Sequence, residues 1–117
     1  GVFRTETHME EGTKKLVDLR ERIGQAHLSD KSAVFNTARM EALELDNLLE
    51  VAEATAISAL TRTESRGAHA RDDYQVRDDE NWLCHSIYSP ISRQTTKREV
   101  NFSPKTVPTF EPQERVY

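Results

Sequence analysis

The sequence predicts a mainly α fold, with two long helices followed by a short β-hairpin and an extended tail. Two observations support this. Before residue 64, apolar residues recur at three-, four- and seven-residue steps, the period of an amphipathic helix. After residue 82 the sequence changes to β-forming residues and then to prolines. We expect residues 1–66 to form an antiparallel helical hairpin. Residues 67–117 should add a charged turn, the β-hairpin and the tail of the same domain.

Composition limits both the core and the class of partner. A chain of 117 residues suits one small domain, and 36% hydrophobic residues predict a thin core. The net charge of −4, with both signs interspersed, argues against a nucleic-acid partner. The single cysteine, Cys84, excludes an internal disulfide. No apolar run reaches the roughly 18 residues that a membrane helix needs.

The first helix has a start signal, an apolar stripe and a stop signal. Thr7 and Glu10 have the T-x-x-E spacing of a capping box, in which two side chains satisfy free amides at a helix start. The stripe consists of Met9, Leu16, Leu19 and Ile23. Gly24 should end the helix, and residues 25–34 should form a polar connection.

The second helix should begin at Phe35 and Asn36. Asn36 suits the N-cap position, and Phe35 is placed to pack on Met40. The helical pattern continues without proline or glycine to about Thr63. At about 1.5 Å per residue this gives roughly 40 Å of helix.

This second helix has two apolar faces. One stripe consists of Ala38, Ala42, Leu45, Leu49, Ala52, Ala56 and Leu60. The other consists of Met40, Leu43, Val51, Ala54 and Ile57. The first helix can cover only one face, so we infer a further bundle helix upstream of Gly1. The alternative is that the C-terminal tail folds back over the second face.

The C-terminal part should contain a β-hairpin. Residues 82–88 form the first candidate strand, which Pro90 ends. Residues 96–102 form the second, with Val100 and Phe102 on one face. An isolated two-stranded ribbon is marginally stable, so it should pack on the helices or on a partner. Residues 103–117, with three prolines, should be extended.

Charged residues of both signs fill the stretch between the helices and the hairpin. Gly67 stands where a left-handed residue would end the second helix. Around it lie Arg66, His69 and Arg71, followed by two acidic clusters, at residues 72–73 and 78–80. Arginine forks could bind an anionic substrate, or these charges could pair with one another and with helix carbonyls. The residue chemistry favours pairing, and hence a structural turn without a self-sufficient active site.

Metal binding and nucleophilic catalysis have little support. Cys84, His85 and His69 lack the paired spacing of a zinc site, and a buried thiol with structural histidines is the simpler interpretation. Adjacent strand residues point to opposite faces, so Cys84 and His85 should not form a nucleophile–base pair. We therefore expect no catalytic, cofactor-binding or metal-binding residue in this chain.

Several segments together resemble a known family. EALELDNLLEVAEATAISAL, TESRGAHARDDY, RDDENWLCHS and the closing RVY resemble the C-terminal region of the succinate dehydrogenase flavoprotein subunit, in its bacterial form. GVFRT and KKLVDLRERI extend the similarity to the earlier part of the chain. The related fumarate reductase flavoprotein and aspartate oxidase have a similar ESRG-x-H turn. ENWLCHS and the long tail fit the dehydrogenase better.

The resemblance implies a spectrin-like three-helix up-down bundle, of which this chain holds two helices, joined to FAD-binding and capping domains. The family oxidises succinate to fumarate and passes electrons through iron–sulfur centres to quinone. Its FAD and catalytic residues would lie upstream. The implied partners are those two domains, the iron–sulfur subunit and, indirectly, the membrane anchor subunits. The implied location is the cytoplasmic side of the bacterial inner membrane. Arg66, Gly67, His69 and Arg71 would then form a structural or docking turn.

Two other functions remain open at this point. One is a free-standing helical adaptor, and a reading frame without upstream flavin domains would favour it. The other, least favoured, is an anion-binding enzyme that uses Arg66 and His69. Because one helical face lacks a neighbour, we also expect the isolated chain to self-associate as a dimer.

Overall fold

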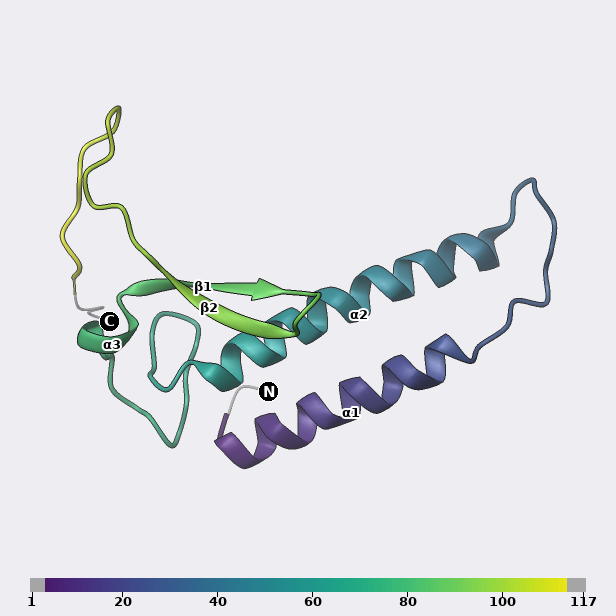
Figure 1. Cartoon of the computed structure of the whole chain (residues 1–117), viewed down its shortest axis with the longest axis horizontal. Helices are drawn as coiled ribbons and strands as arrows, with labels where there is room; N and C mark the ends of the chain where they lie inside the picture. Colours follow the sequence, from purple (N-terminus) through teal and green to yellow (C-terminus); the bar gives the residue numbers. More distant parts are fainter. Residues whose placement is uncertain (1–3, 114–117) are drawn as a thin grey trace.

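The computed structural model describes residues 4–113 and confirms a mostly helical chain with a small antiparallel sheet. The elements are α1 (Glu6–Gly24), α2 (Thr37–Thr61), α3 (Asp79–Trp82), β1 (Cys84–Ser89) and β2 (Gln94–Glu99). α1 and α2 run antiparallel, and the hairpin crosses the C-terminal half of α2 (Figure 1). Among the helices of residues 4–113, none has the length and apolar character needed to cross a membrane.

α1 begins earlier than the sequence pattern predicts. Its N-cap is Thr5, whose hydroxyl accepts the His8 amide at 3.5 Å, so the predicted capping box of Thr7 and Glu10 is wrong. The reason is tertiary, because the Asp73 carboxylate accepts the Glu6 amide at 2.7 Å and satisfies a free donor of the first turn. At the other end, α1 stops at Gly24, as expected.

α2 begins at the predicted cap. The Asn36 side chain accepts the Arg39 amide at 2.8 Å, which confirms it as the N-cap. The predicted packing of Phe35 on Met40 is wrong, since these side chains are 97% and 64% exposed. Phe35 has a positive φ of 52°. α2 ends at Thr61 rather than Thr63, because Arg62 is already extended.

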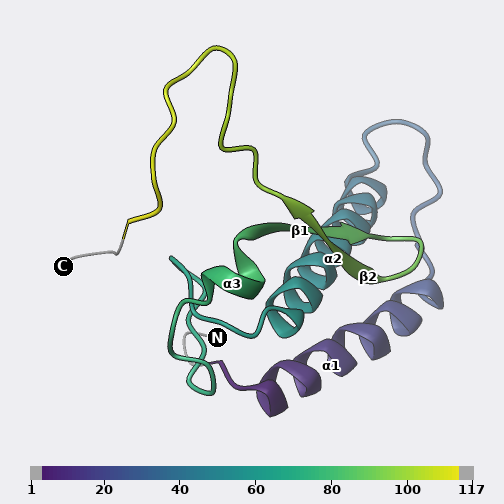
Figure 2. The ribbon, with the colours of Figure 1, turned by 60° about the vertical axis from the view of Figure 1, so that its left-hand side comes forward.

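The two faces of α2 differ in how well they are covered. Leu49, on the first stripe, is buried, and with Trp82 it forms the buried apolar core of residues 4–113. On the second stripe Met40, Leu43 and Val51 are more than half exposed. The hairpin packs on α2, whereas residues 100–113 loop away from α1 and α2 before the Gln113 carbonyl accepts Arg77 at 2.8 Å (Figure 2). The N-terminal half of the second stripe therefore stays open.

A polar joint connects both helices to the hairpin. Arg20 of α1 donates to Glu50 at 2.8 Å and to Glu53 at 2.6 Å, both on α2. Glu53 is 1% exposed, and its other oxygen lies 3.5 Å from Nε of Arg93 in the hairpin turn. Arg93 adopts a positive φ of 52°, which is uncommon outside glycine. Ion pairs thus hold elements together where the apolar core is thin.

The hairpin is shorter than predicted and starts later. β1 and β2 pair antiparallel, from Cys84 opposite Glu99 to Ser89 opposite Gln94. Trp82 belongs to α3 rather than to a strand, because Asp78 caps this short helix by accepting the Asn81 amide at 3.0 Å. Val100 and Phe102 lie beyond β2, so their predicted common strand face is wrong. The Trp82 ring lies against Lys97 of β2 at 3.7 Å and against Arg62 at 5.1 Å.

Candidate functional site

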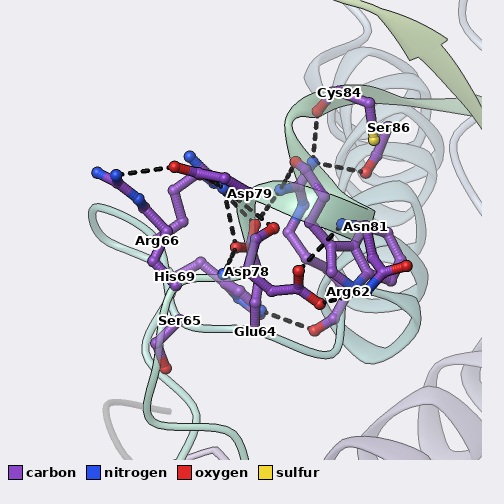
Figure 3. Close-up of polar contacts among 12 residues, drawn as sticks. Arg62, Glu64, Ser65, Arg66, His69, Asp78, Asp79, Asn81, Cys84 and Ser86 are labelled. Atoms are coloured by element: carbon purple, nitrogen blue, oxygen red, sulfur yellow. Dashed lines mark hydrogen bonds and ion pairs between the residues drawn. The ribbon is translucent and has the colours of Figure 1, made fainter. Parts of the chain in front are cut away.

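The candidate site is the turn between α2 and α3, residues 62–79 (Figure 3). Gly67 adopts a positive φ of 59°, which confirms the expected left-handed conformation. Its expected role at the end of the second helix is wrong, because α2 already stops at Thr61 and Arg62 is its extended C-cap. On either side of the glycine, the Arg66 amide donates to the His69 carbonyl at 2.8 Å, and the His69 amide donates back at 3.0 Å. A Cβ at Gly67 would meet no atom within 4 Å, so the requirement for glycine is conformational rather than steric.

Glu64 is the buried acceptor at the centre of the turn (Figure 3). Its fully buried carboxylate accepts Arg66 Nε at 2.8 Å, the Asp78 amide at 2.8 Å and the Arg62 guanidinium. Burial opposes ionisation, but Arg66, the Asp78 amide and Arg62 together hold the pKa of Glu64 below its ordinary value. Sequence reasoning did not single out Glu64. The sequence does place Glu64 between Arg62 and Arg66, and this spacing indicates a carboxylate that could pair with either arginine.

Arg66 links this centre to α3. Its guanidinium donates to both oxygens of Glu64 and, at 2.6 Å, to Asp79. Asp79 also pairs with Arg77 at 2.8 Å. The Arg66 and Arg77 contacts hold the pKa of Asp79 below its ordinary value. The fold thus brings Arg66 into contact with Asp79 of the second acidic cluster, residues 78–80.

Arg71 closes the C-terminal end of α2. The residue is 1% exposed and donates to both oxygens of Asp73, at 2.8 and 2.6 Å. It also donates to the carbonyls of Leu60 at 2.9 Å and Arg62 at 3.2 Å, which the helix end leaves free. The Arg71 hydrogen bonds hold the pKa of Asp73 far below its usual range. Its guanidinium also lies over the Tyr74 ring, 4.6 Å from the centroid.

His69 lies between the start of α1 and the end of α2. Its Nδ1 is 2.9 Å from Arg4 Nη1, and its Nε2 is 3.1 Å from the Arg62 carbonyl oxygen. A guanidinium only donates, so Nδ1 accepts and Nε2 carries the proton of a neutral ring. Burial lowers the pKa of His69, and the charges of Arg4, Arg71 and Arg62 lower it further.

The remaining candidates border an open groove along α2. His69, Cys84 and His85 all line it, together with Arg4 and Arg62. In the described part of the chain, no group of three or more histidine, cysteine or acidic side chains is arranged to hold a metal ion. The described glycines lie in α1 and in the turn, so residues 4–113 provide no glycine-rich loop for a dinucleotide phosphate. The residues described here do not fit a flavin nucleotide.

Solved structures of larger proteins contain a region with the same fold as this chain. The fold matches E. coli quinol fumarate reductase FrdA with a TM-score of 0.76 and 36% identity, over 95% of this chain and 20% of that chain. It matches Mycobacterium smegmatis Sdh1 with a TM-score of 0.66 and 32% identity, over 99% of this chain and 18% of that chain. The structure is therefore that of a domain found within larger respiratory flavoproteins.

The sequence comparison makes the assignment specific. Residues 1–117 match the family described as fumarate reductase flavoprotein C-term, and the chain belongs to this family. It is 53% identical to the succinate dehydrogenase flavoprotein subunit of Coxiella burnetii, over 98% of this chain and 19% of the relative. It is 38% identical to the fumarate reductase flavoprotein subunit of Haemophilus influenzae, over 100% of this chain and 19% of the relative. The chain thus spans about one fifth of the length of these relatives.

Proposed function

We propose that this chain is the C-terminal domain of the FAD-containing subunit of a succinate dehydrogenase. The complete enzyme would oxidise succinate to fumarate and pass electrons through iron–sulfur centres to quinone. The match along the whole chain, with 53% identity to a succinate dehydrogenase flavoprotein subunit, carries this proposal. The same match favours a part of a flavoprotein over a free-standing adaptor. It equally disfavours an autonomous anion-binding enzyme, as does the engagement of Arg66 and His69 by groups of the chain itself.

The role of this chain within the enzyme would be structural and docking. The arginines of the turn are bonded to neighbouring carboxylates and carbonyls, which supports a fixed scaffold rather than a substrate site. FAD and the catalytic residues would belong to FAD-binding and capping domains upstream. No step of the reaction is assigned to residues of this chain.

The open face of α2 is the surface that we assign to the upstream polypeptide. Met40, Leu43 and Val51 of the second stripe are each more than half exposed, and large exposed apolar surface tends to find a partner. A helix preceding Gly1 would complete a three-helix bundle there. In its absence, a second copy of this chain is the expected occupant, which gives the dimer of the isolated fragment.

The two halves of the chain would act as one domain. Residues 1–66 would be the part with the helical hairpin, and residues 67–117 the part with the turn, the β-hairpin and the tail. Contacts from Glu6 to Asp73 and from Glu53 to Arg93 cross this division, which supports a single unit. The complete subunit would contact the iron–sulfur subunit directly and the membrane anchor subunits indirectly. It would lie on the cytoplasmic side of the bacterial inner membrane.

The complete polypeptide, purified with its partner subunits, tests the proposal. We expect bound flavin and succinate-dependent reduction of an electron-accepting dye. A flavoprotein that reduces fumarate without oxidising succinate would support the second candidate, a fumarate reductase. The 38% identity to the Haemophilus influenzae subunit and the fold match to E. coli FrdA favour that candidate next. A complete polypeptide that binds no flavin would contradict both.

A further inference from the structure

Three contacts from the turn hold the segment that leads into α1, residues 4–6. The Asp72 amide donates to the Arg4 carbonyl at 2.8 Å, and the Glu6 amide donates to Asp73 Oδ2 at 2.7 Å. Arg4 Nη1 donates to His69 Nδ1 at 2.9 Å. Two of the three bonds engage the backbone of this lead-in segment, so they fix the direction of the chain itself.

The part of the turn that makes these contacts is attached firmly to α2. Arg71 is fully engaged by Asp73 on one side and by the carbonyls of Leu60 and Arg62 on the other. His69 Nε2 also bonds the Arg62 carbonyl. The position of the lead-in segment is therefore coupled through these hydrogen bonds to the C-terminal end of α2, which is more than 50 residues away in sequence.

One of the three contacts depends on a neutral side chain. Protonation of His69 would place an N–H opposite the Arg4 guanidinium, where there is no acceptor. The charged groups that face the ring are Arg4 from the lead-in segment, Arg62 from the end of α2 and Arg71 from the turn. Glu64 bonds Arg62 and Asp73 bonds Arg71, while His85 of β1 borders the same groove. A cationic ring would thus add a fourth positive charge beside three arginines.

We propose that residues 69–73 form a clamp that sets the direction in which the polypeptide enters the helical domain, and that the clamp loosens when His69 takes up a proton. The inference rests on the proposed function in one respect, since it requires flavin-binding domains upstream of Gly1. The partner of the clamp is this chain's own lead-in segment. In the complete subunit, the clamp would control how those domains are placed relative to the bundle.

Hydrogen exchange of the complete flavoprotein tests the clamp. The exchange rate is measured in a peptide that covers residues 4–10 and is corrected for the intrinsic exchange rate at each pH. Between about pH 7.5 and about pH 5.5, the range in which histidine titrates, protection of this peptide should fall. Below the ordinary histidine pKa of 6.5 the fall should approach tenfold for each pH unit, until His69 also takes up a proton in the closed clamp, so it should reach at most about tenfold at about pH 5.5. His69→Lys should show fast exchange already at the higher pH, and His69→Gln should remove the pH dependence. His27→Lys, in the exposed connection between α1 and α2 and away from this groove, is the matched control and should behave as the parent protein.

The outcomes separate the clamp from the proposed function. Equal protection of the peptide in His69→Lys and the parent protein would overturn the clamp, even if flavin binding and succinate oxidation are intact. If His69→Lys does not fold, Asp73→Asn supplies the test, with Asp72→Asn as control because Asp72 contributes its backbone amide. Faster exchange of residues 4–10 in Asp73→Asn but not in Asp72→Asn supports the clamp. Unchanged exchange in both contradicts it.

Discussion

Glu64 organises the turn as a buried acceptor. It receives hydrogen bonds from two arginines and one backbone amide, and it has no exposed surface. A buried carboxylate is stable only when its charge is fully compensated, because transfer from water is otherwise costly. The carboxylate and its partners therefore act as a unit, and removing one member leaves the others with buried, unpaired charge.

Replacing Glu64 by Gln should destabilise the turn by about 3 kcal/mol or more, the usual effect of breaking a buried ion pair. Because the pKa of Glu64 is lowered on folding, its stabilisation is fully present above the ordinary value of 4.5 and is lost as pH falls further. Chemical denaturation as a function of pH checks both points. An unaltered unfolding profile for Glu64→Gln would contradict the role of Glu64.

Gly67 is constrained by its backbone conformation rather than by space. Gly67→Val should cost about 1 kcal/mol or more, since a β-branched residue resists positive φ. Gly67→Asn should cost less, because asparagine tolerates the left-handed region. The difference in free energy of unfolding between the two variants is the measurement. Equal stability of the Val and Asn variants would show that conformation at this position does not limit the fold.

At the scale of elements, α1 and α2 are joined by the polar contact of Arg20 with Glu50 and Glu53. Arg20→Met should leave the buried Glu53 carboxylate poorly paired, at a cost of about 3 kcal/mol. Arg22→Met, two residues later on the exposed side of α1, should change stability by less than about 0.5 kcal/mol. Thermal unfolding of both variants checks the contrast. A similar effect of the two substitutions would show that the joint contributes little.

Sequence patterns predicted the helices well, because amphipathic period and capping are local properties. Asn36 caps α2 by accepting the Arg39 amide three residues away, and α1 ends at Gly24, where the Gln25 amide bonds carbonyls of the last turn. The start of α1 was missed because its first amide is satisfied by Asp73, far away in sequence. The β-propensity of Trp82 favours a strand, but the Asp78 cap places it in α3.

The candidate site was predicted in part. Pattern alone indicated that the charges of the turn pair with one another, and it placed Gly67 in a left-handed conformation. It did not identify Glu64, nor the contact of His69 with Arg4, because both depend on how the turn folds against α1 and α2. Long-range partners of this kind have no signature in local spacing.

At the scale of the whole molecule, the open stripe of α2 should govern association. We expect the isolated chain to sediment as a dimer. Val51→Glu, on the exposed part of the stripe, should shift it towards monomer. Leu49→Glu should instead unfold the chain, because Leu49 is 5% exposed. Ile57→Glu tests the part of the second stripe nearer the hairpin. A folded monomer at high protein concentration would contradict the dimer.

The central claim is that this chain supports a flavoprotein from outside its catalytic centre. The most direct measurement compares the absorbance of the purified chain, at about 450 nm where oxidised flavin absorbs, with that of the complete polypeptide after dialysis. Circular dichroism would first establish that the isolated chain is helical. We predict a colourless chain without succinate-dependent dye reduction, and a yellow, active complete polypeptide. Flavin absorbance that the isolated chain retains through dialysis would contradict the account.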